Sequence, residues 1–258
     1  MDLGLGGRTA FITGASRGIG AATARVLAAE GARVAVCARD GAALSALVDE
    51  IGGAAAGHRA LALDLSEAGA PQQAVGWLAK EMGDVEIVVH NLGGTLGVRE
   101  PLGPATEWAR VFHFNLGIAI DLNSGLLPPM IERKYGRIIA LSSLAGFEHQ
   151  GSIPYSVAKA ALTAYIRGMG RTYAPDGVVI SAVVPGVIAT EGNNWGELMR
   201  RDPAEAQRYL ADRVPRGRFG APEEVAQAVA FLASRHADAF AGSIVPLEGG
   251  QGRSFFGQ

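Results

Sequence analysis

The chain has 258 residues, of which 48% are apolar and 19% charged, and its formal net charge is −2. This composition excludes an intrinsically disordered chain, which is rich in charges and poor in apolar residues. Because no basic excess is available to neutralise a run of phosphates, it also argues against a dedicated nucleic-acid-binding protein.

Two further absences narrow the class of protein. Cys37 is the single cysteine, so a disulfide framework is impossible, and the five histidines show no metal-ligand spacing, so we predict no metal site. The first residues lack a signal-peptide pattern, and no uncharged apolar stretch reaches the roughly 18 residues of a membrane span. We therefore expect a cytoplasmic protein without a membrane segment.

Short apolar runs alternate with helix-like stretches along the whole chain. The predicted strands cover residues 9–12, 33–37, 60–63, 87–90, 137–141, 178–184 and 243–247. Most of them are continuously apolar, which is typical of strands buried on both faces of a parallel sheet. The predicted helices cover residues 20–30, 41–51, 72–82, 108–134, 155–174, 204–214 and 223–234.

This alternation predicts an α/β fold, namely a doubly wound parallel sheet of about seven strands with helices on both faces. The chain contains no repeat, low-complexity tract or long linker, so we expect residues 1–258 to form a single domain. In such sheets ligands bind beyond the carboxyl ends of the strands, and functional residues should therefore follow the strand runs.

A glycine-rich loop follows the first predicted strand. Gly14, Gly18 and Gly20 are spaced by three residues and then by one. Glycine permits a tight turn and lets the backbone approach a pyrophosphate, which then meets the unpaired N–H groups of the next helix. Because the loop follows a strand and opens a helix, we predict a Rossmann-type dinucleotide site rather than an ordinary turn.

Basic residues stand where the choice between the two nicotinamide dinucleotides is made. An acidic residue at the end of the second strand would bind the ribose 2′-hydroxyl of NAD, but Ala38 occupies this position. Arg39 follows it and Arg17 lies in the glycine loop, and two guanidiniums would pair with a 2′-phosphate. The sequence therefore favours NADP(H), the alternative being that both arginines are solvated surface charges.

Tyr155 and Lys159 are four residues apart on a predicted helix, so their side chains share one face. A free tyrosine has a pKa near 10 and is a poor acid or base at pH 7. The charge of Lys159 would favour the phenolate and move the pKa of Tyr155 toward neutrality. This pair is a candidate proton donor and acceptor.

These motifs, together with Asn-Leu-Gly-Gly at 91–94, resemble the short-chain dehydrogenase/reductase family over residues 7–250, and in particular its branch of 3-oxoacyl-carrier-protein reductases. The resemblance implies hydride transfer between NADP(H) and a ketone or secondary alcohol, with Tyr155 exchanging the proton. It also implies that Ser143 orients the substrate oxygen, with Ser142 as the alternative, and that Lys159 binds the nicotinamide ribose. Asn115 would hold a water that links Lys159 to solvent.

The resemblance further implies a set of cofactor-binding positions after the strands. They comprise Gly14, Ser16, Arg17, Gly18, Ile19, Gly20, Arg39, Asp64, Leu65, Asn91, Gly93, Tyr155, Lys159, Pro185, Gly186, Ile188 and Thr190. Leu92 is larger than the residue that the family carries there, and Asp64 could instead be a simple turn residue.

The family places a mobile lid over the substrate at about residues 191–215. Trp195 in this segment, and His149 in the serine–tyrosine loop, are candidate substrate contacts beside Ser143. Apolar and aromatic lid residues are consistent with a partly hydrophobic small-molecule substrate. The family is usually tetrameric, and Phe255 and Phe256 near the C-terminus are expected to pack on a neighbouring subunit.

Other functions share these motifs. Reductases of steroid, sugar or xenobiotic ketones would carry the same residues. A lyase or epimerase that oxidises its substrate transiently, and a non-enzymatic NADP(H)-binding regulator on the same fold, are the alternatives from other classes. The Ser143–Tyr155–Lys159 set weighs against the regulator, because a sensor needs no proton donor.

Overall fold

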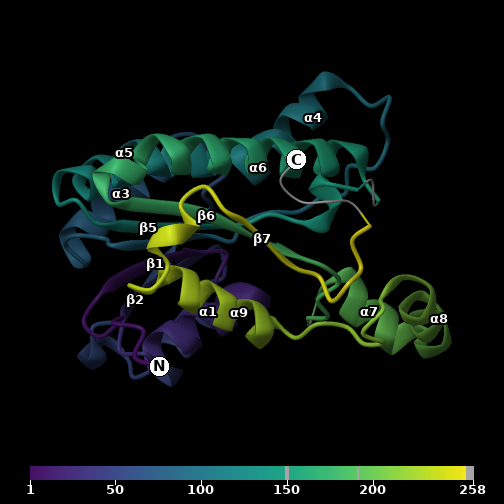
Figure 1. Ribbon diagram of the computed structural model, residues 1–258, viewed down its shortest axis with the longest axis horizontal. Helices are drawn as coiled ribbons and strands as arrows, with labels where there is room; N and C mark the ends of the chain where they lie inside the picture. Colours follow the sequence, from purple (N-terminus) through teal and green to yellow (C-terminus); the bar gives the residue numbers. More distant parts are fainter. Residues whose placement is uncertain (149–150, 191, 254–258) are drawn as a thin grey trace.

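The computed structural model describes residues 1–148, 151–190 and 192–253. One parallel sheet of seven strands forms its centre, in the order β3-β2-β1-β4-β5-β6-β7 (Figure 1). The strands are β1 Thr9–Thr13, β2 Arg33–Ala38, β3 Arg59–Ala62, β4 Ile87–His90, β5 Gly136–Leu141, β6 Val178–Pro185 and β7 Ile244–Leu247. The predicted doubly wound sheet is confirmed, and each strand begins and ends within one residue of its predicted bounds.

The central strands are apolar because both of their faces are covered. Every residue of β1, β4, β5 and β6 is buried, whereas the edge strand β3 alternates between half-buried and exposed residues. Side chains of successive strand residues point to opposite faces, so Ile12 and Phe11 belong to two different cores. The sheet therefore separates two apolar layers.

Helices cover both faces (Figure 1). One core contains side chains of α1 (Gly18–Ala29), α2 (Gly41–Glu50) and α9 (Pro222–Ala233). The other contains side chains of α3 (Ala70–Glu81), α5 (Ile118–Glu132) and α6 (Ile153–Tyr173). Within the described ranges, no helix is both long and apolar enough to cross a membrane.

The predicted helix at 108–134 is interrupted. The structure has α4 at Ala105–Phe112, a π-helical turn at His113–Gly117 and then α5. The side-chain amide of Asn115 donates to the carbonyl of Val111 at 2.8 Å, one turn back, and so competes with the regular backbone ladder. The single uninterrupted helix was thus a wrong expectation, and the interruption occurs at a candidate site residue.

A second helix in the 191–215 region was not predicted. α7 spans Asn194–Arg201 and α8 spans Pro203–Arg213. Each has a polar N-cap: Asn193 accepts from the N–H of Gly196, and Asp202 accepts from the N–H of Glu205, both at 2.8 Å. We call these two helices the α7–α8 pair. In Figure 1 the pair lies at the end of the molecule away from the N-terminus.

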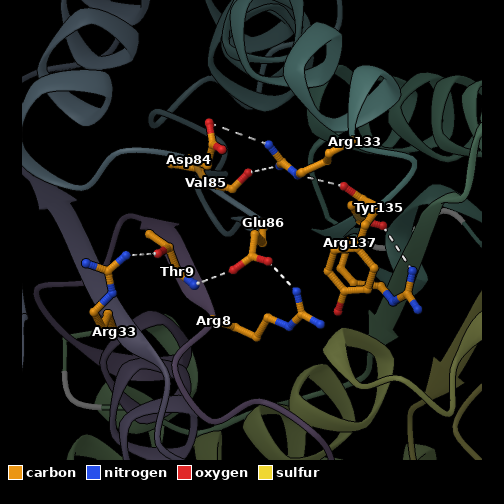
Figure 2. Close-up of polar contacts among 10 residues, drawn as sticks. Arg8, Thr9, Arg33, Asp84, Val85, Glu86, Arg133, Tyr135 and Arg137 are labelled. Atoms are coloured by element: carbon orange, nitrogen blue, oxygen red, sulfur yellow. Dashed lines mark hydrogen bonds and ion pairs between the residues drawn. The ribbon is translucent and has the colours of Figure 1, made fainter.

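An arginine–tyrosine clamp joins the amino ends of β1, β4 and β5. Figure 2 shows the Tyr135 ring between Arg8 and Arg137, whose guanidinium carbons lie 4.2 and 4.8 Å from the ring centroid. Arg8 also pairs with Glu86, and the buried Arg137 pairs with Asp238 at 2.5 Å. These contacts lie at the edge of the sheet opposite to the predicted site.

Candidate active site

The glycine loop forms the turn between β1 and α1. Gly14 and Gly18 have φ angles of +65° and +58°, in the left-handed region that favours glycine. A Cβ at Gly20 would lie 2.5 Å from the Gly14 carbonyl oxygen, so the loop closes too tightly for any side chain. α1 begins after Arg17 with no side-chain cap and no acidic residue in its first turn. Its first N–H groups can therefore bind an anion such as a pyrophosphate.

Asn91, which directly follows β4, holds this loop by hydrogen bonds. Its side-chain amide donates to the carbonyls of Thr13 and Gly14, both at 3.0 Å, and its backbone N–H donates to the Thr13 hydroxyl at 3.0 Å. Leu92 packs against Gly14, where a Cβ would approach Leu92 to 3.1 Å. The larger residue at 92 is thus accommodated, and the amide of Asn91 is engaged by the protein itself.

The segment after β6 reaches the same loop. A Cβ at Gly18 would lie 3.4–3.5 Å from side-chain atoms of Thr190, so Thr190 covers the glycine loop. Asn193 shapes this segment: its amide donates to the Ile188 carbonyl at 2.7 Å, and its oxygen accepts from the Thr190 N–H at 3.2 Å. Sequence reasoning overlooked Asn193, although an asparagine preceding a helix is a common N-cap signal.

The two arginines of the cofactor prediction have different neighbours. The side chain of Arg39 is 80% exposed, and its guanidinium lies 3.8 Å from a carboxylate oxygen of Asp64. Hydrogen bonds from Ser66, with the charge of Arg39 as a smaller cause, lower the pKa of Asp64. Arg17 lies against the backbone of Gly192, at the start of the 192–215 region.

Ser143, Tyr155 and Lys159 meet beyond the carboxyl end of β5. The Ser143 hydroxyl lies near the Tyr155 side chain, and the Lys159 Nζ lies 5.8 Å from the Tyr155 ring centroid. Burial raises the pKa of Tyr155, and the nearby Ser143 hydroxyl opposes this. The sequence predicts that Lys159 lowers the pKa of Tyr155, whereas in the protein alone burial is the largest influence on it and acts in the opposite direction.

Lys159 is buried, with 2% of its surface exposed. Its Nζ donates to the Leu141 carbonyl at 2.7 Å, and burial lowers its pKa to about 7. Asn115 lies close by, with its side chain bonded to the backbone N–H and carbonyl of Gly94 at 2.9 and 2.8 Å. Both side chains border Gly93, where a Cβ would lie 2.6 Å from Lys159 Nζ and 2.9 Å from Asn115 Oδ1.

The adjacent serines have separate partners. The Ser142 hydroxyl is buried against α6, 2.8 Å from the Thr163 hydroxyl and 3.3 Å from the Lys159 carbonyl. The Ser143 hydroxyl instead accepts from the Ala145 N–H at 3.2 Å and lies near Tyr155. The geometry therefore favours Ser143 over Ser142 as the serine that contacts a substrate.

Of the predicted substrate residues, the structure brings Ser143 but not Trp195 to Tyr155 and Lys159. Trp195 packs in an apolar cluster with Tyr209 and Phe219, with ring centroids 4.6 and 5.7 Å from its own. A neighbouring cavity of about 350 Å³ is lined by the α7–α8 pair and residues 217–222, not by Ser143 or Tyr155. His149 and the terminal phenylalanines lie outside the described residues, within which no cluster of potential metal ligands occurs.

The sequence profile of the family described as short chain dehydrogenase matches residues 8–197 of this chain. The chain belongs to the short-chain dehydrogenase family. It is thus an oxidoreductase of the class that acts on CH–OH groups. The predicted family membership, and the likeness to its 3-oxoacyl-(acyl-carrier-protein) reductase branch, are confirmed by individual relatives.

This short-chain dehydrogenase is 33% identical over 246 residues to the 3-oxoacyl-(acyl-carrier-protein) reductase FabG of Escherichia coli strain K12, covering 95% of this chain and 97% of that protein. Its structure is similar to that of L-sorbose reductase of Gluconobacter frateurii, solved with NADPH and L-sorbose, with a TM-score of 0.89 and 29% sequence identity. The match covers 99% of this chain and 100% of that one. A 3-oxoacyl-(acyl-carrier-protein) reductase of Agrobacterium tumefaciens C58, solved with NADP bound, has a TM-score of 0.88, 33% identity and 95% coverage of both chains.

Proposed function

We propose that this short-chain dehydrogenase transfers hydride between NADP(H) and a ketone or secondary alcohol, with Tyr155 as the proton donor and acceptor. The observation that carries the proposal is the convergence of Tyr155, Ser143 and the buried Lys159 beyond the carboxyl end of β5. A paired tyrosine and serine hydroxyl can hold a carbonyl oxygen from two directions while one of them exchanges a proton.

Chain residues would bind the cofactor along the carboxyl edge of the sheet. The glycine loop and the start of α1 would hold the pyrophosphate, with Thr190 beside the same loop. Lys159 would bind the nicotinamide ribose, and the Ile188 backbone would bind the carboxamide. The bound nicotinamide supplies or accepts the hydride.

Residues of α6 and of the π-helical turn then transfer the proton or position the groups that do. During reduction Tyr155 gives its proton to the ketone oxygen, and Ser143 donates a hydrogen bond to the same oxygen. The Tyr155 phenolate regains a proton from the side of Lys159, whose pKa of about 7 allows it to give and take a proton near neutrality. Asn115 fixes the backbone that borders Lys159.

A preference for NADP(H) is supported by Arg17 and Arg39 and by relatives that bind NADP or NADPH. Arg39 is exposed and only loosely paired with Asp64, so it can turn to a 2′-phosphate at little cost. Replacing Arg39 by alanine should raise the KM for NADPH about tenfold and leave that for NADH unchanged. An equal change for both cofactors would contradict this role.

The α7–α8 pair is proposed to act as the substrate lid of one domain that spans the chain, and the substrate is a small ketone. By their names, the relatives above reduce a 3-oxoacyl-(acyl-carrier-protein) and L-sorbose, so a 3-oxoacyl compound and a keto-sugar both belong in a substrate panel. Ile120 on α5 and Val157 on α6 are each 42% exposed, which supports homotetramer formation through these helices.

The test is the consumption of NADPH, and separately NADH, with a β-ketoacyl thioester, a 1,2-diketone, a cyclic ketone and a keto-sugar. Wild type should reduce some of these ketones, and Tyr155→Phe should lose roughly 10²- to 10⁴-fold in kcat while still binding NADPH. Tight NADPH binding with no turnover on any ketone would refute the reductase and leave a regulator. Retention of bound NADP+ through purification would indicate a lyase or epimerase.

A further inference from the structure

A short segment after β7 passes beside both the α7–α8 pair and the backbone that follows β6. In Figure 1 it is the yellow chain between β7 and the grey terminal trace. Most of this segment is glycine or half-buried, but Gln251 is only 6% exposed. A buried side-chain amide needs hydrogen-bond partners, and within the described residues Gln251 has partners on two different elements.

The carboxamide oxygen of Gln251 rests on the turn after β6. It accepts from the Val187 N–H at 3.2 Å, and a Cβ at Gly186 would approach it to 2.8 Å. Val187 directly precedes Ile188, which is proposed to face the nicotinamide. The oxygen of Gln251 thus fixes the backbone on one side of Ile188, while Asn193 holds its carbonyl on the other.

The nitrogen of the same carboxamide holds α8. It donates to the Tyr209 hydroxyl at 3.0 Å, and the Tyr209 ring packs against Trp195 of α7 at 4.6 Å. At its start, α7 is tied to the segment after β6 by the hydrogen bond from Asn193 to Ile188. The pair otherwise meets Val187 and Phe219 in an apolar cluster, whose contacts are non-directional. The Gln251–Tyr209 bond adds a fixed direction to that contact.

We infer that Gln251 is a positioning residue that couples the placement of the α7–α8 pair to the backbone beside the nicotinamide site. The inference rests on the proposed function, in which this pair is the substrate lid. The rigid carboxamide of Gln251 joins Tyr209 of α8 to the backbone at Val187, so a displacement of α8 would displace the Val187 N–H as well. The ketone and the cofactor would then be positioned by one linked structure rather than by two independent ones.

The kinetic test uses two variants that break the bridge at different points. Tyr209→Phe keeps the ring but loses the bond to Gln251, and it should raise the KM for the ketone about fivefold without changing the Kd for NADPH. Gln251→Leu removes the bonds to Val187 and to Tyr209 and should raise the ketone KM and the NADPH Kd together. In the double variant the ketone KM should equal that of Gln251→Leu alone, because both changes remove the same link.

Hydrogen exchange of the amides in residues 203–213 gives a second readout that does not depend on turnover. Tyr209→Phe and Gln251→Leu should speed this exchange with and without NADPH, whereas Tyr173→Phe, a hydroxyl deletion at the far end of α6, should not. Unchanged exchange in 203–213, or a ketone KM within twofold of wild type in both variants, would overturn the inference. A wild type that reduces no ketone would refute the proposed function, and the exchange result would still decide whether Gln251 holds α8.

Discussion

Replacing Gly93 by alanine should disable the site without unfolding the protein. The new Cβ would lie 2.6 Å from Lys159 Nζ and 2.9 Å from Asn115 Oδ1, and contacts below 3.4 Å are rare for real Cβ atoms. Lys159 Nζ would have to retreat by about 0.8 Å, the difference between 3.4 Å and 2.6 Å. It cannot do so freely, because it is buried and bonded to Leu141 at 2.7 Å. A misplacement of about 1 Å can cost about 10²-fold in rate, so we expect kcat to fall by roughly that factor.

Gly94→Ala is the matched control for this experiment. Its Cβ would meet only Phe114, at an ordinary 3.9 Å, and neither glycine has a φ that excludes alanine. Steady-state ketone reduction with NADPH should therefore show a large loss of kcat in Gly93→Ala and less than a twofold change in Gly94→Ala. Thermal unfolding checks that both variants are folded. Equal kcat values in the two variants would refute the assignment of Lys159 and Asn115 to the reaction.

Other variants separate the remaining roles. Ser143→Ala should lower kcat by roughly 10²- to 10³-fold; Ser142→Ala should instead cost about 1 kcal/mol of unfolding free energy, and equal kcat losses would contradict this division. Because burial lowers the pKa of Lys159 to about 7, the unfolded chain binds this proton more tightly, so wild type should gain stability over Lys159→Met from pH 7 to pH 10.5. Measured by urea unfolding, the difference in unfolding free energy between wild type and Lys159→Met should rise by at most about 1.4 kcal/mol per pH unit. A difference that falls with pH would contradict the lowered pKa. Asn91→Ala should raise the KM for NADPH about tenfold as the glycine loop loosens, with kcat at saturating NADPH retained.

The strands could be predicted closely because burial on both faces leaves a run of apolar residues with sharp ends. The helix boundaries needed more than periodicity. Nothing in the apolar pattern of 108–134 marks the π-turn, which depends on the Asn115 amide taking the Val111 carbonyl. α7 has an N-cap signal at Asn193 but is only eight residues long, so its apolar side chains span too few turns to establish a helical period.

Individual site residues could be predicted where a sequence motif specifies a chemical role, as at Tyr155 and Lys159. Contacts between segments that are distant in the sequence could not be predicted. Gln251 is one glutamine in a glycine-rich tail, and only the fold brings it to Val187 and Tyr209. Likewise, a sequence cannot say that Trp195 packs on Tyr209 and Phe219 in a cluster separate from Ser143.

The arginine–tyrosine clamp of Figure 2 bears on how this chain could be re-engineered. The clamp ties Arg8, Tyr135 and Arg137 together at the amino ends of three central strands. Because its contacts draw nothing from the loops at the carboxyl edge, those loops can vary while the clamp stays intact. A combinatorial library restricted to residues 192–215, which hold the proposed lid, would therefore vary the carboxyl edge on a scaffold whose anchoring end is untouched.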